Sequence, residues 1–309
     1  MTVCDAASGV LRAGTRSSDL ARVQTRYVGT ELARLTGIRL PHEILIDTAG
    51  DRDSTTPLPE LGGRGVFTDA LERALLAGEI DYAVHSLKDV PVDPTPGLVL
   101  AAIAFREDAR DVFISRAGAV LDALPQGSRV GTCSVRRSVQ LLRHRPDLQI
   151  LPLRGNVDTR VRKVRSGEYD GIILAAAGLA RLGLGGGGVH PLPFEIMLPA
   201  PGQGALAVQC RADDSGTIAL LARLDDTVVR EATSAERAFL EGLGGGCLAP
   251  IAAHAWIDNG TVTLDGLVAA PDGSAVIRLR HSGPGTSGRE TGLRMAEVAV
   301  SRGALELLA

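Results

Sequence analysis

Aromatic residues are scarce in this sequence of 309 residues, at 3% of the total, and lysine is almost absent. Lys88 and Lys163 are the only lysines, so the other 31 of the 33 basic residues are arginine. A formal net charge of −3 and few aromatic rings exclude the basic field and the stacking platforms that nucleic-acid binding needs. Arginine instead favours carboxylate ligands, because its planar fork matches the two carboxylate oxygens.

Cysteine is sparse, and long apolar runs are missing. Cys4, Cys133, Cys210 and Cys247 form no C-x-x-C pair, and no histidine stands at zinc-ligand spacing from them, so we expect no metal. No apolar run reaches the roughly 18 residues of a membrane span, and residues 1–11 lack the pattern of a signal peptide. These absences predict a cytoplasmic protein with free thiols and no membrane partner. Nothing in the sequence demands an oligomer, so we expect a monomer.

Length and composition predict a globular protein of two or three domains, because 45% of the residues are hydrophobic and 22% are charged. Over the first two thirds of the chain, short apolar strands alternate with helices. The expected strands are 10–14, 43–47, 82–85, 129–131, 149–153, 171–175 and 205–210, and the expected helices are 20–35, 67–77, 136–143 and 157–165. Continuous apolar strands between helices indicate sheets covered on both faces, which is typical of the α/β class.

The character of the sequence changes at about residue 229. A helix at 230–241 is followed by a run of glycines. Asn259-Gly260 and Asp272-Gly273 then lie between short apolar segments, as in β-hairpins. With a last helix at about 290–308, this part predicts a small α+β unit. Residues 199–204 combine proline and glycine and form a candidate hinge or crossover.

Small hydroxyl residues and arginines meet in the segment 131–137, where an expected strand leads into a helix. Thr132 and Ser134 precede Arg136 and Arg137, which fall in the first helical turn. Arginine is unfavourable there, because a helix N-terminus carries about half a positive charge. A bound anion would remove that conflict. An ordinary capped helix with solvated arginines is the alternative.

The same combination recurs after two other expected strands. Arg16 and Ser18 follow the first strand, and Arg154-Gly155 follows the strand at 149–153, with Arg160 one turn further on. Open α/β sheets bind ligands at the carboxyl ends of their strands, so the three loops indicate a ligand with several anionic groups. The sequence holds neither of the glycine-rich motifs of nucleotide-binding proteins, which favours carboxylates over phosphates.

Two further segments carry reactive side chains. Ser86, Lys88 and Asp89 follow the strand at 82–85, and Asp89 could act as a base or stabilise a developing positive charge. A simple turn aspartate before Pro91 is the alternative. In the second segment, three glycines precede Cys247 and leave its thiol uncrowded, which favours a functional thiol. The other three cysteines are expected to be inert.

Taken together, these segments resemble the porphobilinogen deaminase family, also called hydroxymethylbilane synthases. The similarity extends from about Arg12 to the last helix. The segments that carry it are AVHSLKDVP at 83–91, GTCSVRR at 131–137, LRGNV at 153–157, AAAGLARLG at 175–183, PGQGA at 201–205 and GGC at 245–247. None of these motifs is specific by itself, but the occurrence of all six in the order of the family is highly specific.

The resemblance implies an α/β fold with two lobes like those of periplasmic binding proteins, each with a mixed sheet, and a small α+β C-terminal domain. Lobe 1 would comprise residues 1–104 and 203–224, lobe 2 residues 105–202, and the C-terminal domain residues 225–309. The chain would cross between the lobes and return at the Gln203 segment.

The resemblance also implies an enzyme that releases ammonia from porphobilinogen and joins four units head to tail. The units grow on a dipyrromethane cofactor that Cys247 holds through a thioether, and hydrolysis then releases hydroxymethylbilane in tetrapyrrole and haem biosynthesis. Asp89 would be the central catalytic carboxylate, assisted by Lys88. The cofactor would be held by Ser86, Lys88, Thr132, Ser134, Arg136, Arg137, Arg154, Gly155 and Arg160. The substrate would be bound by Arg16, Ser18, Arg64, Phe67, Arg154, Arg181 and Gln203.

The sequence departs from the family at several positions. Glu60 stands where lysine is common, Arg64 replaces another lysine, Asp19 replaces a proline, and Cys133 replaces a serine. The alternative function is a two-lobed carboxylate-binding protein without catalysis. Such a protein would use the same arginine loops, but it would not need the Lys88-Asp89 pair or the glycine-flanked thiol.

Overall fold

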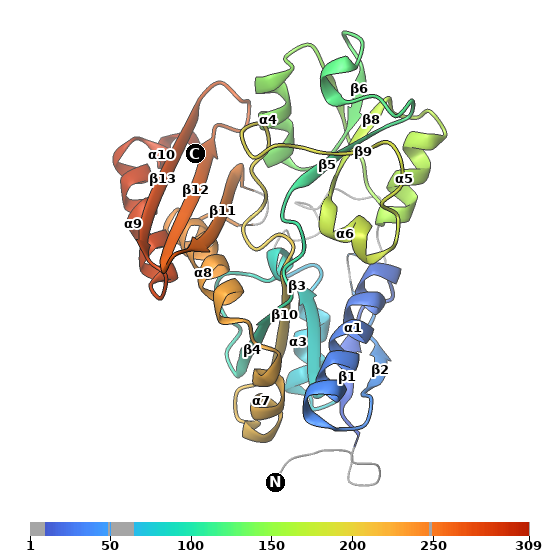
Figure 1. Cartoon of the computed structure of the whole chain (residues 1–309), viewed down its shortest axis with the longest axis vertical. Coiled ribbons are helices and arrows are strands. Elements are labelled where there is room, and N and C mark those ends of the chain that lie inside the picture. The colour runs from blue at the N-terminus through green and yellow to red at the C-terminus, as the bar shows by residue number, and fades with distance from the viewer. Residues whose placement is uncertain (1–9, 49, 51–64, 247–248, 309) are drawn as a thin grey trace. The chain divides into compact units, whose positions relative to one another are not determined.

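The computed structural model describes residues 10–48, 50, 65–246 and 249–308. The chain divides into two compact units (Figure 1). Unit 1 comprises Met1–Arg106 and Ala205–Arg230, and unit 2 comprises Glu107–Gly204 and Glu231–Ala309. The chain therefore leaves unit 1 after Arg106 and returns to it at Ala205. The three-domain boundaries given above remain a prediction.

Unit 1 contains a five-stranded sheet in the order β2-β1-β3-β10-β4. Strand β1 runs parallel to both β2 and β3, whereas β10 runs antiparallel to both β3 and β4. The strands are β1 (Arg12–Thr15), β2 (His42–Leu45), β3 (Tyr82–Ser86), β4 (Leu98–Ala104) and β10 (Leu206–Arg211). The helices are α1 (Asp19–Thr36), α3 (Asp69–Leu76) and α7 (Ser215–Leu221), with short 3₁₀ helices η1 (Leu87–Asp89) and η3 (Ala222–Leu224).

Unit 2 repeats this design in the order β7-β6-β8-β5-β9. Strand β6 is parallel to both neighbours, and β5 is antiparallel to both of its own. The strands are β5 (Asp111–Ser115), β6 (Arg129–Gly131), β7 (Gln149–Leu151), β8 (Gly171–Ala175) and β9 (Val189–Pro191). The helices are α4 (Val135–His144), α5 (Val157–Arg165), α6 (Ala176–Arg181) and η2 (Leu121–Ala123). In each sheet the antiparallel strand, β10 or β5, is the first strand after the chain has crossed between units.

Both sheets bury side chains on both faces, as the apolar strands predicted. In β8, Ile172 and Leu174 belong to one hydrophobic cluster and Ile173 to another. In β3, Tyr82 and Val84 pack with α1, whereas Ala83 packs with α3. Successive strand residues point to opposite faces, so one strand serves two cores. The mixed sheets with helices on both faces confirm the predicted α/β class.

The C-terminal part of unit 2 is an antiparallel sheet in the order β11-β12-β13, which confirms both expected hairpins. Its elements are α8 (Thr227–Gly242), β11 (Ile251–Asp258), β12 (Thr261–Ala269), β13 (Val276–Pro284), α9 (Gly288–Ser301) and α10 (Ala304–Leu308). Phe239 of α8 and Met295 of α9 are fully enclosed in its core with strand residues such as Leu264.

The structure corrects the predicted elements at several places. The single last helix is wrong, because Gly303 adopts a left-handed conformation with φ 87° and separates α9 from α10. Strands β4, β5 and β9 and helices α6 and α7 were not expected. Within the part of the chain that the structure describes, no helix is long and apolar enough to cross a membrane.

Candidate active site

The loops singled out in unit 1 follow parallel strands. Strand β1 ends at Thr15, just before Arg16 and Ser18, and β3 ends at Ser86, just before Lys88 and Asp89. Because the carboxyl ends of parallel strands meet at one edge of a sheet, these residues lie together. Lys88 and Asp89 form part of η1 and are half-buried.

A pocket opens at this edge of unit 1. Arg16, Ser18, Phe67, Ser86 and Asp89 line it, and the sequence had predicted a role for all of them. The Arg16 guanidinium carbon lies 4.2 Å from the centre of the Phe67 ring, a cation–π contact that orients the arginine. The structure thus brings a carboxylate, a guanidinium and two hydroxyls to one concave surface.

Three buried polar residues of the pocket were missed from the sequence: Gln24, Thr68 and His85. Gln24 of α1 donates from Nε2 to Oγ of Ser86, over 3.1 Å. Its helical position gave a usable signal, since it stands four residues after Leu20 and four before Val28, on the buried side of the helix. A polar residue in an apolar stripe indicates either a buried partner or a ligand.

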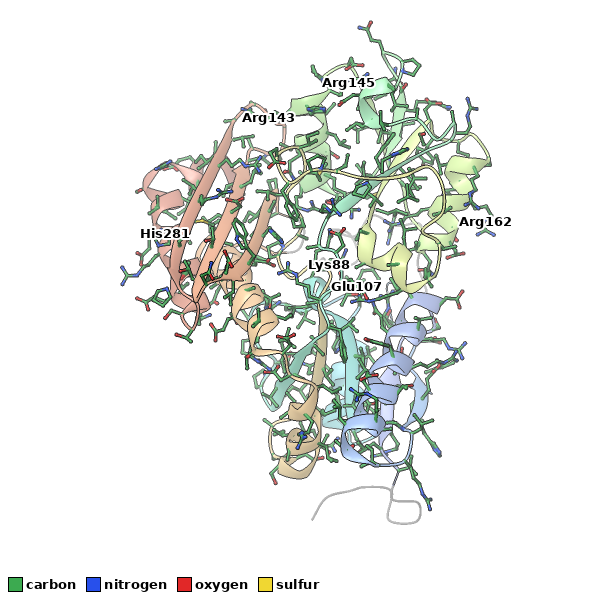
Figure 2. The ribbon with its side chains drawn as sticks, in the orientation of Figure 1. Lys88, Glu107, Arg143, Arg145, Arg162 and His281 are labelled. Atoms are coloured by element: carbon green, nitrogen blue, oxygen red, sulfur yellow. The ribbon has the colours of Figure 1, made fainter. Side chains whose placement is uncertain are left out.

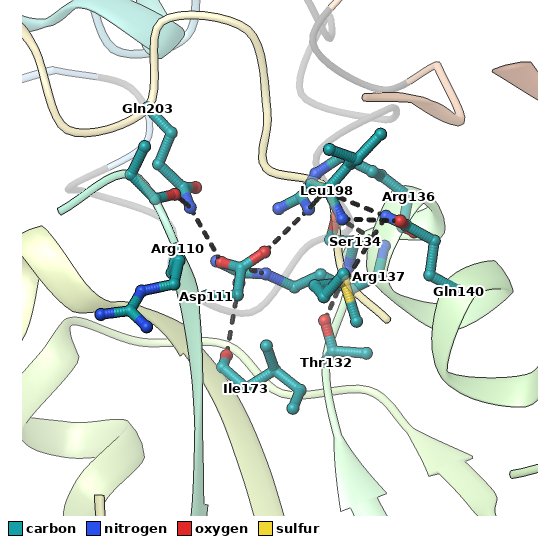
Figure 3. Close-up of polar contacts among 12 residues, drawn as sticks. Arg110, Asp111, Thr132, Ser134, Arg136, Arg137, Gln140, Ile173, Leu198 and Gln203 are labelled. Atoms are coloured by element: carbon teal, nitrogen blue, oxygen red, sulfur yellow. Dashed lines mark hydrogen bonds and ion pairs between the residues drawn. The ribbon is translucent and has the colours of Figure 1, made fainter. Parts of the chain in front are cut away.

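In unit 2, a buried carboxylate that the sequence did not identify organises the second group of residues. Asp111, at the start of β5, is fully buried and accepts hydrogen bonds from Arg136, Arg137 and Gln203 (Figure 3). The donor–acceptor distances are 2.8 Å from Arg136 Nη1, 2.7 Å from Arg137 Nη2 and 3.0 Å from Gln203 Nε2. Arg136 and Gln203 also donate to the carbonyls of Leu198 and Ala109.

Burial alone would raise the pKa of Asp111, but the guanidinium groups of Arg136 and Arg137 outweigh it and hold the pKa well below its usual range. Asp111 therefore stays ionised. One negative charge faces two positive charges, so the cluster keeps an excess of one positive charge in a buried place. An additional anion is the natural complement of that excess.

The structure gives both arginines a partner that the sequence had not foreseen, and the expected solvated alternative is wrong, because only 5% of Arg136 and 7% of Arg137 is exposed. By contrast, the side chain of Arg162 on α5 is 73% exposed and extends outward (Figure 2). Whether Arg136 and Arg137 also bind a ligand carboxylate remains a prediction.

The loop before α4 is held by its own hydroxyls. Thr132 Oγ1 accepts from the Ser134 amide at 3.1 Å, and Ser134 Oγ accepts from the Arg137 amide at 3.4 Å, so Ser134 caps the helix. Both hydroxyls keep acceptor or donor capacity beyond these contacts.

Arg154 follows β7 at the same edge of the second sheet. Its Nη1 atom is buried and has no hydrogen-bond partner in the structure as described. A buried guanidinium nitrogen without a partner is costly, so this atom fits an acceptor from a bound molecule. Gly155 has φ 113°, which favours glycine, and its carbonyl accepts from Arg160 Nε at 2.6 Å. Arg181 Nη2 donates to the Gly204 carbonyl at 2.6 Å.

Two predicted residues, Cys247 and Arg64, lie outside the described residues, as does Glu60. Cys133 is exposed, and Cys210 is buried, where burial raises the pKa of its thiol to about 11. Among the residues that are described, no group of histidine, cysteine or carboxylate side chains could hold a metal ion.

The fold and the strand-end loops define a class of protein: a two-unit α/β protein whose loops carry arginines and hydroxyls and, in unit 1, a half-buried carboxylate. Two family models match the chain. Residues 11–219 match "Porphobilinogen deaminase, dipyromethane cofactor binding domain", and residues 231–300 match the C-terminal domain of the same family.

Curated relatives agree with the family models. Porphobilinogen deaminase of Brevibacillus brevis is 48% identical over 305 residues and covers 97% of both chains. The enzyme of Geobacillus kaustophilus is 48% identical over 288 residues, which is 92% of this chain and 93% of that one. Among solved structures, a periplasmic binding protein of Brucella ovis with glutathione bound aligns with 76% of this chain and 68% of its own, at 15% identity and a TM-score of 0.41.

The chain belongs to the porphobilinogen deaminase family. It is a transferase of tetrapyrrole biosynthesis with a dipyrromethane cofactor. The alternative of a binding protein without catalysis is not supported, because the relatives are enzymes. The residues present also fit that cofactor, because the unpartnered Arg154 nitrogen and the positive excess around Asp111 suit its carboxylates.

Proposed function

We propose that the chain releases ammonia from porphobilinogen and joins four such units head to tail, with Asp89 as the catalytic carboxylate, and then releases hydroxymethylbilane by hydrolysis. The observation that supports these residue roles is the pocket of unit 1, in which Asp89 stands with Arg16, Ser18 and Ser86. The substrate carries two carboxylates and a protonated amine. Its binding therefore needs a guanidinium and hydroxyls for the carboxylates and a carboxylate for the amine.

Asp89 would hold the N–H groups of a pyrrole and stabilise the positive charge that develops on the substrate ring as ammonia departs. A fixed carboxylate is ready for that charge before it forms. The half-buried setting strengthens the attraction, since less water screens the carboxylate. Lys88 would assist by binding a ligand carboxylate beside it.

Arginines would hold the carboxylates of the cofactor and the growing chain. In unit 1, Arg16 and Ser18 would bind the incoming substrate, with Phe67 packed against the guanidinium. In unit 2, the residues proposed to hold the cofactor are Thr132, Ser134, Arg136, Arg137, Arg154, Gly155 and Arg160. Ser86 and Lys88 would add contacts from unit 1, and Arg181 and Gln203 would bind substrate groups.

The cofactor supplies a pyrrole with a free α-carbon, to which the first unit is added. Cys247 would hold it by a thioether, which keeps it attached while the product is hydrolysed away. We also propose that the protein is a cytoplasmic monomer that needs no nucleic-acid or membrane partner. The proposed division of labour places Asp89 in lobe 1, the arginine loops in lobe 2 and Cys247 in the C-terminal domain.

Mass spectrometry of the intact active protein tests the attachment. We expect a mass that exceeds the polypeptide by one dipyrrole, located on Cys247 by peptide mapping. Cys247→Ser should lose both the adduct and the activity, while Cys133→Ser, which removes an exposed thiol, should retain the adduct. An active protein of unmodified mass, or full activity in Cys247→Ser, would refute the attachment.

Asp89→Asn tests the carboxylate. The substitution keeps the size and removes the charge, so we expect turnover to fall by at least about 10²-fold while the melting temperature stays unchanged. Asp93→Asn, at an exposed position four residues further on, is the matched control and should turn over normally. Equal turnover in Asp89→Asn and the wild type contradicts the assignment.

A further inference from the structure

A line of buried polar groups runs under the pocket of unit 1. Glu72 of α3, Gln209 of β10 and His85 of β3 are 7%, 4% and 5% exposed, respectively. Gln209 Nε2 lies 2.9 Å from Glu72 Oε1, and Gln209 Oε1 lies 3.0 Å from His85 Nε2. The second carboxylate oxygen of Glu72 accepts from the Thr95 hydroxyl at 2.8 Å. The proposed function does not use this line.

The sheet register explains why these residues meet. His85 stands opposite Ala207, and Gln209 is two residues further along β10, so both side chains lie on the same face as diagonal neighbours. Ala83 of the same face packs with Leu71 and Leu75 of α3, the helix that carries Glu72. Ser86 points to the other face, where α1 supplies Gln24.

The hydrogen bonds fix where the protons are. Both oxygens of Glu72 accept hydrogen bonds, one from Gln209 Nε2 and one from the Thr95 hydroxyl, so the amide oxygen of Gln209 faces His85. The Nε2 atom of His85 then has to donate, which leaves Nδ1 of a neutral ring without a proton. Glu72 thus selects one tautomer of His85 through the amide of Gln209.

His85 also lines the pocket beside Asp89. The charged groups that face the ring are Glu72 from α3, Asp89 from η1 and Arg16 from the loop after β1. Burial lowers the pKa of His85 to about 4, against the opposing effects of both carboxylates. The ring is therefore uncharged at neutral pH. This agrees with its hydrogen-bond partner, which is the neutral amide of Gln209 and not a carboxylate.

We propose that Gln209 and Glu72 are positioning residues that hold His85 as the neutral Nε2–H tautomer, so that no positive charge arises at position 85 beside Asp89. An imidazolium at position 85 would place a positive charge near Asp89 and weaken the stabilisation of a cationic substrate ring. The consequence for catalysis rests on the role proposed for Asp89, whereas the tautomer does not.

Nuclear magnetic resonance of the holoenzyme labelled with ¹⁵N-histidine tests the tautomer directly, with His85→Gln used to assign the signal. We expect a neutral ring protonated on Nε2 throughout pH 5.5–8. A ring protonated on Nδ1, or an imidazolium at pH 7, overturns the proposal. Glu72→Gln replaces a carboxylate by an amide that can donate as well as accept, so the Gln209 amide can take either orientation. His85 should then show both tautomers, and an unchanged single tautomer also overturns the proposal.

Gln209→Glu tests the catalytic consequence. A carboxylate against Nε2 should raise the pKa of His85 and shift the acid limb of the kcat/KM profile upward by about one pH unit or more. Gln209→Met removes the hydrogen bonds of Gln209 to Glu72 and His85 without adding charge. The activity of this variant should therefore fall, but the acid limb of its kcat/KM profile should not shift. Identical kcat/KM profiles for the two folded variants overturn the charge argument. If Gln209→Glu does not fold, the histidine spectra of the wild type and of Glu72→Gln decide whether the proposal holds. A wild-type protein without deaminase activity would refute the proposed function and leave the tautomer intact.

Discussion

At Asp111, a single carboxylate of β5 holds together groups from two other segments of unit 2. Arg136 and Arg137 reach it from α4, Gln203 from the chain that leads back to unit 1, and Arg136 ties the cluster to the Leu198 carbonyl. Ionised side chains so deeply buried are tolerated only when each finds an opposite charge and hydrogen bonds. The position of both arginines therefore depends on this one residue.

Asp111→Asn should destabilise the protein by about 3–5 kcal/mol, because two buried guanidinium groups lose their counter-charge. Urea unfolding measures the change. Asp108→Asn is the matched control, since Asp108 forms an exposed ion pair with Arg110, with side chains 38% and 41% exposed, and its loss should cost about 1 kcal/mol or less. Similar losses in the two variants would show that the buried cluster does not carry stability.

Residue types and loop positions made most of the pocket of unit 1 predictable. The partners of Arg136 and Arg137 could not be predicted in this way. Arg16, Ser18, Phe67, Ser86 and Asp89 were identified from strand-end loops and from family motifs, and they line one pocket. Asp111 stands 25 residues before Arg136 in an apolar strand, and nothing local distinguishes it from a surface aspartate. Long-range pairing of this kind depends on the register of β5 against β8, which a single sequence does not reveal.

At the scale of elements, two helices that follow predicted ligand loops, α1 in unit 1 and α4 in unit 2, have different N-terminal caps. Ser134 caps α4 through its hydroxyl, whereas Ser18 at the N-cap of α1 makes no such hydrogen bond. A capping hydroxyl satisfies an amide that the helix leaves unpaired. The hydroxyl of Ser134 thus contributes to helix stability, whereas that of Ser18 makes no such contribution.

Ser134→Ala should lower the free energy of unfolding by about 1 kcal/mol, and Ser18→Ala by less than about 0.5 kcal/mol. Ser18→Ala should also raise KM for porphobilinogen, because its hydroxyl is proposed to bind the substrate. Chemical denaturation together with steady-state kinetics distinguishes the two effects. If Ser18→Ala changes neither stability nor KM, its place in the proposed substrate site is wrong.

Elements with a strong local pattern were predicted with accurate bounds, and elements that depend on the rest of the fold were not. The helix predicted at 157–165 and the strand at 171–175 match α5 and β8. Strand β9 has only three residues, and β4 follows a segment rich in proline, so neither shows a clear alternation. These strands are defined by their neighbours, since β9 pairs only along β5 and β4 along β10.

At the scale of the whole molecule, the five-stranded sheets of both units have the same arrangement of strands but carry different loops. In each, the ends of the parallel strands and the start of one antiparallel strand share an edge, so loops after β1 and β3 gather in unit 1 and loops after β6 and β7 in unit 2. The antiparallel strands β10 and β5 begin directly after the chain changes unit. Within each unit, the strand order therefore places the crossover segment next to the predicted ligand loops.

The return crossover depends on Gly204. It has φ 92°, and its carbonyl accepts from the Glu107 amide at 3.1 Å, which joins the outgoing and returning segments. A Cβ at Gly204 would lie 2.4 Å from the Glu107 carbonyl oxygen, an atom of the backbone that cannot move aside. The left-handed conformation and this close approach together require glycine.

We expect Gly204→Ala to destabilise the protein by about 3 kcal/mol, from the unfavourable φ and the steric clash. Gly186→Ala is the control, because nothing lies within 4 Å of a Cβ there and its φ is not positive; alanine should be neutral or slightly stabilising by restricting the unfolded chain. Thermal and urea unfolding of both variants measure the difference. Because Arg181 donates to the same Gly204 carbonyl, the kinetic constants of Gly204→Ala should change as well. A fully stable and active Gly204→Ala would mean that the two crossover segments can separate without consequence.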